Sequence, residues 1–332
     1  MITVLTGGTG GAKFVDGLLQ IVPPEELTII VNTGDDLRWW GLYVSPDVDS
    51  IIYVLAGKLS RERGWGVMGD TFFCLKSMGE MGEPDWFHIG DRDLALHIFR
   101  SRLLAEGKTL SEATDEIAAR LGIKSQILPM SNSRIETRVI TPTADLSFEE
   151  YFVRRRFQDP VESVRFAGAS ESVPAPGVLD AIRSAEIVVL APSNPVTSIG
   201  PILAVPGIRE ALRETRGRIV AVSPIVGGAA VTGPAGALLA SQGFAVSIAG
   251  VADFYRDFLD VLVVDSQDAP AGAELRNREV LKIRESRASG LQVHCAPTIM
   301  RKNNNGDRVA LAKSVMAACQ QLSASLSAGE SA

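Results

Sequence analysis

Short, mostly apolar runs alternate with helix-like patterns along the chain, and polar or glycine-rich loops follow the apolar runs. The first run is Ile2–Leu5, and a second, Leu27–Val31, follows a helical pattern over Phe14–Ile21. Short apolar runs of this kind are typical of strands buried on both faces of a parallel sheet. Strand, helix and strand in this order therefore predict a βαβ unit, in which ligands lie beyond the carboxyl ends of the strands.

The same alternation continues downstream and predicts an α/β fold, namely a Rossmann-like, doubly wound and mainly parallel sheet. Further strands are expected at Ile187–Leu190, Arg218–Val222, Ala245–Ile248, Val261–Val264 and Leu291–His294. Helices are expected at Ser50–Ala56, Asp70–Met78, Leu94–Glu106, Thr109–Leu121, Val178–Ser184, Gly207–Arg213, Ala235–Gln242 and Val309–Leu326.

A different pattern occupies the middle of the chain. Apolar and polar residues alternate in Arg134–Ile140, Glu150–Phe157 and Val161–Phe166, which is typical of antiparallel strands. We therefore expect residues 127–176 to form a smaller inserted α+β element. Residues 1–126 and 177–326 would form the Rossmann-like core, and residues 327–332 a frayed tail.

Composition narrows the classes of function. The net charge of -6 and the isoelectric point near 5.3 disfavour nucleic-acid binding. The three scattered cysteines, Cys74, Cys295 and Cys319, fit a reducing compartment better than a zinc site or a disulfide framework. No apolar run approaches the roughly 20 residues that span a bilayer, and no signal-peptide pattern is present. A cytoplasmic protein without membrane partners is expected.

The turn after the first strand, Gly7–Gly11 followed by Lys13, is a candidate phosphate site. Backbone amides of Gly8, Thr9 and Gly10 at a helix N-terminus, with Lys13, would bind an anion. We expect this helix to begin near Ala12. A tight turn without a ligand is the alternative interpretation. Lys13 stands where the dinucleotide fingerprint needs a glycine, and the P-loop motif is absent.

Polar residues also follow other strands at the same expected edge. Four carboxylates lie within fifteen residues: Asp35, Asp36, Asp47 and Asp49. They would hold Mg²⁺ beside a phosphate, or they would cap a helix and a turn. Ser193 and Asn194 follow a later strand. Trp39, Trp40 and Trp65 either pack or flank a flat ring. Arg154–Arg156 is either a solvated strand or a phosphate clamp.

Taken together, the motifs resemble the 2-phospho-L-lactate transferase family of coenzyme F420 biosynthesis. The matching segments are Gly7–Gly10 with Lys13, Asn32–Asp36, Ser45–Asp49, Arg63–Gly66, Gly90–Asp93, Ser193–Ile199 and Pro224–Gly228. The match runs in order from Met1 to about Ala312. Two positions depart from the family pattern: Gly11-Ala12 replaces Thr-Pro, and His88 stands where the family often has a basic residue.

The resemblance implies a transfer reaction with Mg²⁺ as the cofactor. The deazaflavin alcohol Fo attacks a guanosine-diphospho-linked acid, which is 2-phospholactate, phosphoenolpyruvate or 3-phosphoglycerate, and GMP leaves. A cytoplasmic homodimer is implied. The alternative is a non-catalytic regulatory protein that binds nucleotide sugars, since a related group shares the glycine-rich opening.

The resemblance also assigns roles to residues. Asp36 and Asp49 would be catalytic and hold Mg²⁺, or Asp49 would bind the ribityl hydroxyl of Fo and act as the base. His88 lies at or beside a second position that contacts Fo. Ser193 and Asn194 would contact the nucleotide. The remaining expected substrate-binding residues are Asp35, Arg92, Gly8, Thr9, Gly10 and Lys13.

Overall fold

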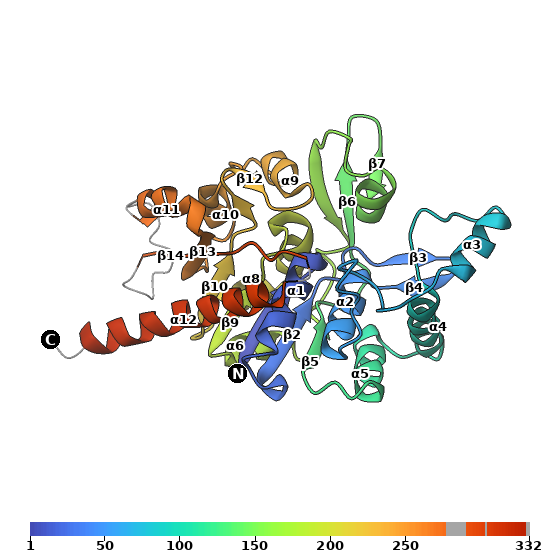
Figure 1. The fold of residues 1–332 in the computed structure, drawn as a ribbon, viewed down its shortest axis with the longest axis horizontal. Helices are drawn as coiled ribbons and strands as arrows, with labels where there is room; N and C mark the ends of the chain where they lie inside the picture. Colours follow the sequence, from blue (N-terminus) through green and yellow to red (C-terminus); the bar gives the residue numbers. More distant parts are fainter. Residues whose placement is uncertain (277–289, 303, 330–332) are drawn as a thin grey trace.

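A seven-stranded parallel sheet forms the centre of the computed structural model (Figure 1). The structure describes residues 1–276, 290–302 and 304–329. Across the sheet the strands are β14 (Gln292–Ala296), β13 (Val261–Asp265), β10 (Arg218–Val222), β9 (Ile187–Leu190), β1 (Ile2–Thr6), β2 (Leu27–Val31) and β5 (Gln126–Pro129). Every neighbouring pair is parallel, which confirms the predicted α/β class.

Two hydrophobic cores cover the two faces of this sheet. Within β1, Val4 belongs to one core and Leu5 to the other, which explains why the central strands are apolar at successive positions. The first core contains side chains of α1 (Gly8–Leu18), α2 (Pro46–Leu55), α5 (Leu110–Arg120) and α12 (Asn305–Gly329). The second contains side chains of α6 (Val178–Ser184), α7 (Gly200–Ala204), α8 (Ile208–Glu214), α9 (Ala235–Ser241), α10 (Ile248–Phe254) and α11 (Ala269–Arg276).

The remaining elements lie outside these layers. The hairpin of β3 (Leu37–Trp39) and β4 (Leu42–Val44) extends with α3 (Phe73–Glu80) and α4 (Asp91–Ala105) to one side of the molecule (Figure 1). A second hairpin pairs β11 (Ile225–Val226) with β12 (Ala229–Ala230). Short helical turns are η1 (Pro24–Glu26), η2 (Glu150–Arg154), η3 (Pro195–Ile199) and η4 (Ser266–Asp268). Among the described residues, no helix combines the length and the apolar character needed to cross a membrane.

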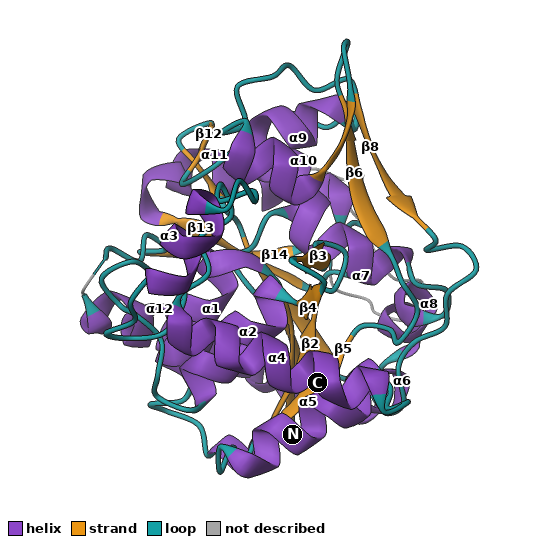
Figure 2. Ribbon diagram, turned by 90° about the vertical axis from the view of Figure 1, so that its right-hand side faces the viewer, coloured by secondary structure: helices purple, strands orange, loops and turns teal. Residues whose placement is uncertain are grey.

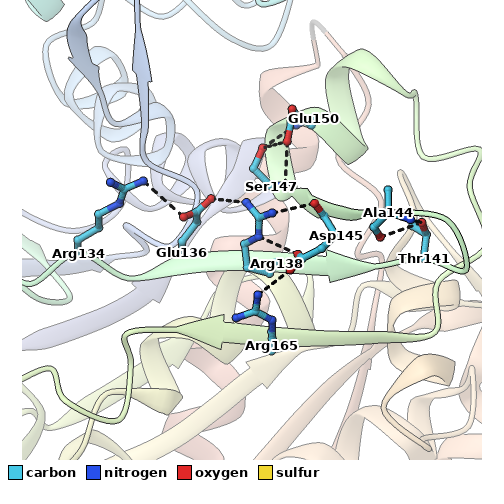
Figure 3. Close-up of polar contacts among 9 residues, drawn as sticks. All are labelled: Arg134, Glu136, Arg138, Thr141, Ala144, Asp145, Ser147, Glu150 and Arg165. Carbon is cyan, nitrogen blue, oxygen red and sulfur yellow. Dashed lines mark hydrogen bonds and ion pairs between the residues drawn. The ribbon is translucent and has the colours of Figure 1, made fainter.

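A three-stranded antiparallel sheet stands at the end of the molecule away from the N-terminus (Figures 1 and 2). Its strands are β7 (Asp145–Ser147), β6 (Glu136–Ile140) and β8 (Ser163–Ala167). Figure 3 shows the charged ladder along it: Arg138 pairs with Glu136 and Asp145, and Arg165 pairs with Asp145. Ser147 and Glu150 cap the turn that follows β7. This ladder fixes the position from which η2 begins.

The structure corrects several sequence expectations. The segment Glu150–Phe157 starts with the π-helix η2 instead of a strand, because its aromatic residues stack along one side. Ala245–Ile248 contains the Ser247 cap of α10 and forms no strand. Residues 127–129 were expected at the start of the inserted element. They belong instead to β5, which lies at the edge of the central sheet because its apolar residues pack beside β2. The division into core and inserted element stays a prediction, and the end of the predicted tail, residues 330–332, lies outside the described residues.

Candidate active site

A cavity of about 590 Å³ opens beyond the carboxyl ends of β1 and β9. This is where the order of the parallel strands reverses, and ligands of such sheets bind at that point. Its walls come from the first turns of α1 and α2, the segment around η2, and loops after β9, β10 and β14. Eight of the predicted site residues line it: Gly8, Thr9, Gly10, Lys13, Asp35, Asp49, His88 and Asn194.

The glycine turn is more tightly built than the sequence suggests. Helix α1 begins at Gly8, four residues before Ala12. Gly8 has φ of +67°, which only glycine adopts without strain, and a side chain at Gly10 would meet the Pro192 carbonyl at 2.4 Å. The Gly8 amide donates to Asp47 Oδ1 at 2.6 Å. The residues of this first helical turn line the cavity, and of their backbone N–H groups that of Gly8 is bound to the Asp47 carboxylate.

Two lysines bring positive charge to the cavity wall. Lys13 on α1 and Lys302 after β14 both line the cavity. The pKa of Lys13 lies below its usual value because the group is partly buried and because Arg308 and Lys302 lie nearby. An anion that binds beside a lysine crowded by other cations stabilises the charged form of that lysine.

A buried cluster of oxygens lies next to this turn. Asn32 Nδ2 donates to Oδ2 of Asp35 and to Oδ2 of Asp47, at 2.9 Å each. Asp35 Oδ1 has no well-aligned hydrogen-bond partner among the described residues. Glu149, which precedes η2, brings a third carboxylate to the same cavity. Three buried carboxyl groups are therefore concentrated here, and the described side chains form no ion pair with them.

The carboxylates of this cluster hold their protons more strongly than usual. Burial raises the pKa of Glu149 to about 8, with contributions from the charges of Asp47 and Asp36. Burial likewise raises the pKa of Asp47 to about 6, although hydrogen bonds from Gly8 and Asn32 oppose the shift. The pKa of Asp35 is raised well above its usual value by burial and by the charges of Asp47 and Glu149. Such mutual repulsion is relieved when a cation binds.

Asp36 and Asp49 have side-chain partners of their own. Asp36 Oδ1 accepts from the Ser45 hydroxyl at 2.6 Å and Oδ2 from the Tyr43 hydroxyl at 2.8 Å, and the residue does not line the cavity. Burial raises its pKa to about 8. Asp49 does line the cavity, and the buried guanidinium of Arg100 donates to both of its oxygens. Their predicted role as metal ligands stays a prediction.

Aromatic side chains cover two other parts of the wall. Trp65 lies under the Arg63 guanidinium, and both line the cavity. From the η2 segment, Phe148 stacks on Phe152 with 5.4 Å between ring centroids, and both reach the cavity. Exposed His88 lies in the same wall, near Phe72. Flat, apolar walls of this kind suit an aromatic ligand.

Three predicted substrate contacts have structural roles. Ser193 is buried, and its hydroxyl donates to the Gly7 carbonyl at 2.7 Å. Asn194 Oδ1 caps η3 by accepting from two amides. Arg92 donates to the Met68 carbonyl and lies on a separate groove beside α4 and α5. The structure thus brings Asn194 to the cavity wall and leaves Arg92 outside it.

Several residues that line the cavity were not predicted as site residues from the sequence. Asp47 belonged to the acidic cluster but was equally explained as a helix cap. Phe152 lies in the segment Glu150–Phe157, which was predicted as a strand, and Glu149 lies directly before it, so neither was assigned to the site. Lys302 follows a short strand near the end of the described chain, with no motif around it.

Comparisons with known proteins decide the family. The family model described as 2-phospho-L-lactate transferase CofD matches residues 2–299. The chain belongs to the CofD family. A 2-phospho-L-lactate transferase of Methanothermobacter thermautotrophicus is 46% identical over 275 residues, which cover 83% of this chain and 88% of that protein. A phosphoenolpyruvate transferase of Streptomyces griseus is 43% identical over 305 residues, covering 90% of this chain and 92% of that protein.

The chain therefore belongs to a family of transferases, as the sequence motifs predicted. A crystal structure of a UPF0052 family protein from Bacillus halodurans superposes with a TM-score of 0.60. It is 17% identical and covers 95% of this chain and 99% of that chain. This likeness supports the fold alone.

Proposed function

We propose that the chain transfers a phospho-acid group from a guanosine-diphospho-linked acid to the deazaflavin alcohol Fo and releases GMP. The observation that carries the proposal is the joining of three features in one cavity: the cationic α1 turn, the carboxylate cluster and the aromatic walls. Relatives named for 2-phospho-L-lactate and for phosphoenolpyruvate support a phospho-acid as the transferred group.

The diphosphate of the donor would bind at the α1 turn. Amides of Thr9 and Gly10 lie in the first turn of α1, where unpaired N–H groups and the helix dipole favour negative charge. Lys13 and Lys302 flank this turn on the cavity wall. Gly8 has its amide on Asp47, so it shapes the turn and contributes less to the anion.

Asp35 and Asp47, with Glu149 beside them, fit a divalent cation such as Mg²⁺. Two observations favour this placement: Asp35 Oδ1 has no well-aligned hydrogen bond, although the Thr137 hydroxyl lies near this carboxyl, and the three carboxylates repel one another. Mg²⁺ held there would supply positive charge to the phosphate oxygens. We prefer this pair to Asp36 and Asp49 because Asp35 Oδ1 has no well-aligned hydrogen bond among the described residues, whereas both oxygens of Asp36 and both of Asp49 accept hydrogen bonds from protein side chains.

The acceptor Fo would place its ring against Trp65 and Phe152 and its ribityl chain toward Asp49. The Asp49 carboxylate accepts the hydrogen bond of the attacking hydroxyl and takes its proton. The hydroxyl oxygen forms a bond to the phosphorus that carries the acid. The bond between that phosphorus and the bridging oxygen breaks, and the oxygen leaves with GMP. Positioning and charge supply most of the catalysis.

A fluorescence titration tests this assignment. Fo is added to the protein with and without GDP and Mg²⁺, and a uridine-diphosphate sugar is titrated in parallel. Saturable Fo binding supports the proposal. Tight binding of the nucleotide sugar with no binding of Fo contradicts it and favours the regulatory alternative. Light scattering of the same sample tests the homodimer that the resemblance implies.

A further inference from the structure

A row of five charged or polar side chains, which we call the ionic seam, joins α2 to α4 in the wall of the cavity, where all of its members except Arg100 line the cavity. Asp49 and Tyr53 come from α2, and Asp93, His97 and Arg100 come from α4. All five are buried: the exposed fraction is 3% for Asp49, 1% for His97 and 0% for Arg100. Such a row is costly to bury unless its members neutralise one another.

The order of contacts in the ionic seam is continuous. The Tyr53 hydroxyl donates to Asp93 Oδ1. His97 Nε2 lies 3.3 Å from the same oxygen, and His97 Nδ1 lies 3.4 Å from Asp49 Oδ2. Arg100 then donates to both oxygens of Asp49. Since the two nitrogens lie on opposite edges of the imidazole, the His97 ring bridges the two carboxylates.

Charge balance favours a bridge over a metal site at this place. Asp49, Asp93 and His97 come close enough together to be ligands. A divalent cation there would lie next to Arg100, which already occupies Asp49. Arg100 already supplies a positive charge to Asp49 without any bound ion. Neither His97 nitrogen has a hydrogen-bond partner of normal geometry among the described residues, so its approach to the two carboxylates and its packing hold the ring.

We propose that His97 is a positioning residue that acts through Asp49, which rests on the function proposed above. A carboxylate offers about four acceptor positions. Two N–H groups of Arg100 use two of them, and the His97 ring lies against Asp49 Oδ2, with Nδ1 3.4 Å away but without a hydrogen bond of normal geometry. Asp49 lines the cavity, so Arg100 and the packed His97 ring restrict the direction in which its remaining acceptor positions face a substrate hydroxyl.

The kinetic test compares three variants of the full chain. His97→Phe keeps a ring but removes both polar edges, and a small misplacement of the reacting groups costs about 10²-fold in turnover. We expect kcat to fall about 10²-fold, with the KM of the guanylyl donor within twofold of wild type. His97→Asn keeps one polar edge and recovers part of kcat. Tyr53→Phe, at the far end of the ionic seam, has a smaller effect.

A spectroscopic test does not depend on activity. The chain has three histidines, so ¹⁵N-histidine spectra are simple, and His97→Asn identifies the His97 signals. Because His97 Nε2 lies 3.3 Å from Asp93 Oδ1, Asp93→Asn is expected to shift the Nε2 signal.

Three results would overturn the proposal: an unmoved His97 Nε2 signal in Asp93→Asn, unchanged kcat in His97→Phe, or loss of the His97 signals on titration with Mn²⁺. A wild-type chain that makes no product contradicts the proposed function instead, and the spectra still decide whether His97 forms the bridge.

Discussion

The backbone N–H of Gly8 donates to Oδ1 of Asp47 at 2.6 Å, which joins the glycine turn after β1 to the first turn of α2. Asp47 Oδ2 accepts from Asn32 at the end of β2. One carboxylate therefore ties together three segments that the sequence presents as separate motifs. The turn that would hold a phosphate and the carboxylates that would hold a cation are parts of a single site.

Asp47→Asn removes the carboxylate charge. The amide oxygen can still accept from Gly8, but the amide nitrogen cannot accept from Asn32, so the melting temperature should fall and turnover is compared on samples that circular dichroism shows to be folded. We expect kcat/KM to fall by about 10²- to 10³-fold, the size of removing one preorganised electrostatic contact. Asp180→Asn, an exposed position on α6, is the matched control. Activity equal to that of the control would remove Asp47 from the site.

Lys13→Gln should weaken binding of the nucleotide donor. A hydrogen bond to a charged group contributes about 1.5–3 kcal/mol, so the Kd of GDP should rise about 10- to 100-fold. Calorimetry measures the change, and Lys76→Gln on exposed α3 is the control. An unchanged Kd for GDP would place the diphosphate away from the α1 turn.

Binding of Mg²⁺ should strengthen as the pH rises. The pKa values of Asp47, about 6, and of Glu149, about 8, mean that both carboxyls lose protons between pH 5 and pH 9. Because a cation binds the ionised form, the Kd of Mg²⁺ should be at least about tenfold lower at pH 8.5 than at pH 6. Binding independent of pH over this range would contradict the assignment.

The stability of the metal-free protein should follow the opposite trend. A carboxyl whose pKa is raised by folding stabilises the protein below its unfolded pKa, and this contribution is lost as pH rises to about 8. The melting temperature should therefore fall between pH 5 and pH 8. In Glu149→Gln the fall should be smaller. An equal fall in both proteins would show that Glu149 titrates normally.

Asp49→Asn should affect stability as well as turnover. The exposed fraction of Arg100 is 0%, so the variant leaves its positive charge without a full partner. Breaking a buried ion pair in this way costs about 3–5 kcal/mol of unfolding free energy. Urea unfolding measures the loss. A stability equal to wild type would mean that Arg100 finds another partner, and Asp49 would then be less firmly held than we argue.

The sequence was sufficient to predict six of the seven strands of the central sheet, because strands buried on both faces are apolar at successive positions. It assigned β5 to the inserted element and expected a strand at Ala245–Ile248 that does not form. It also placed Gly8, Lys13 and Asp49 at one edge, because the carboxyl ends of parallel strands meet there. The sequence did not predict contacts between residues that lie far apart in the chain. Asp47 reaches Gly8 across 39 positions of sequence, and no local pattern shows that contact.

The prediction for the segment around Glu149 was wrong for a different reason. Its alternation of apolar and polar residues is compatible with a strand, whereas the aromatic stacking of Phe148, Phe152 and Phe157 favours the turn of η2. That turn brings Glu149 and Phe152 to the cavity. A wrong local assignment therefore hid two residues of the site, and Figure 3 shows the hydrogen bonds between Ser147 and Glu150 at the start of this turn.

The product of the reaction tests the central claim most directly. The purified chain is incubated with Fo, Mg²⁺ and each guanosine-diphospho-linked acid, and mass spectrometry follows the products. The account predicts a phosphodiester between Fo and one of the acids, formed in equal amount to GMP and abolished by excess chelator. Intact Fo with no GMP released from any of the three donors would contradict it.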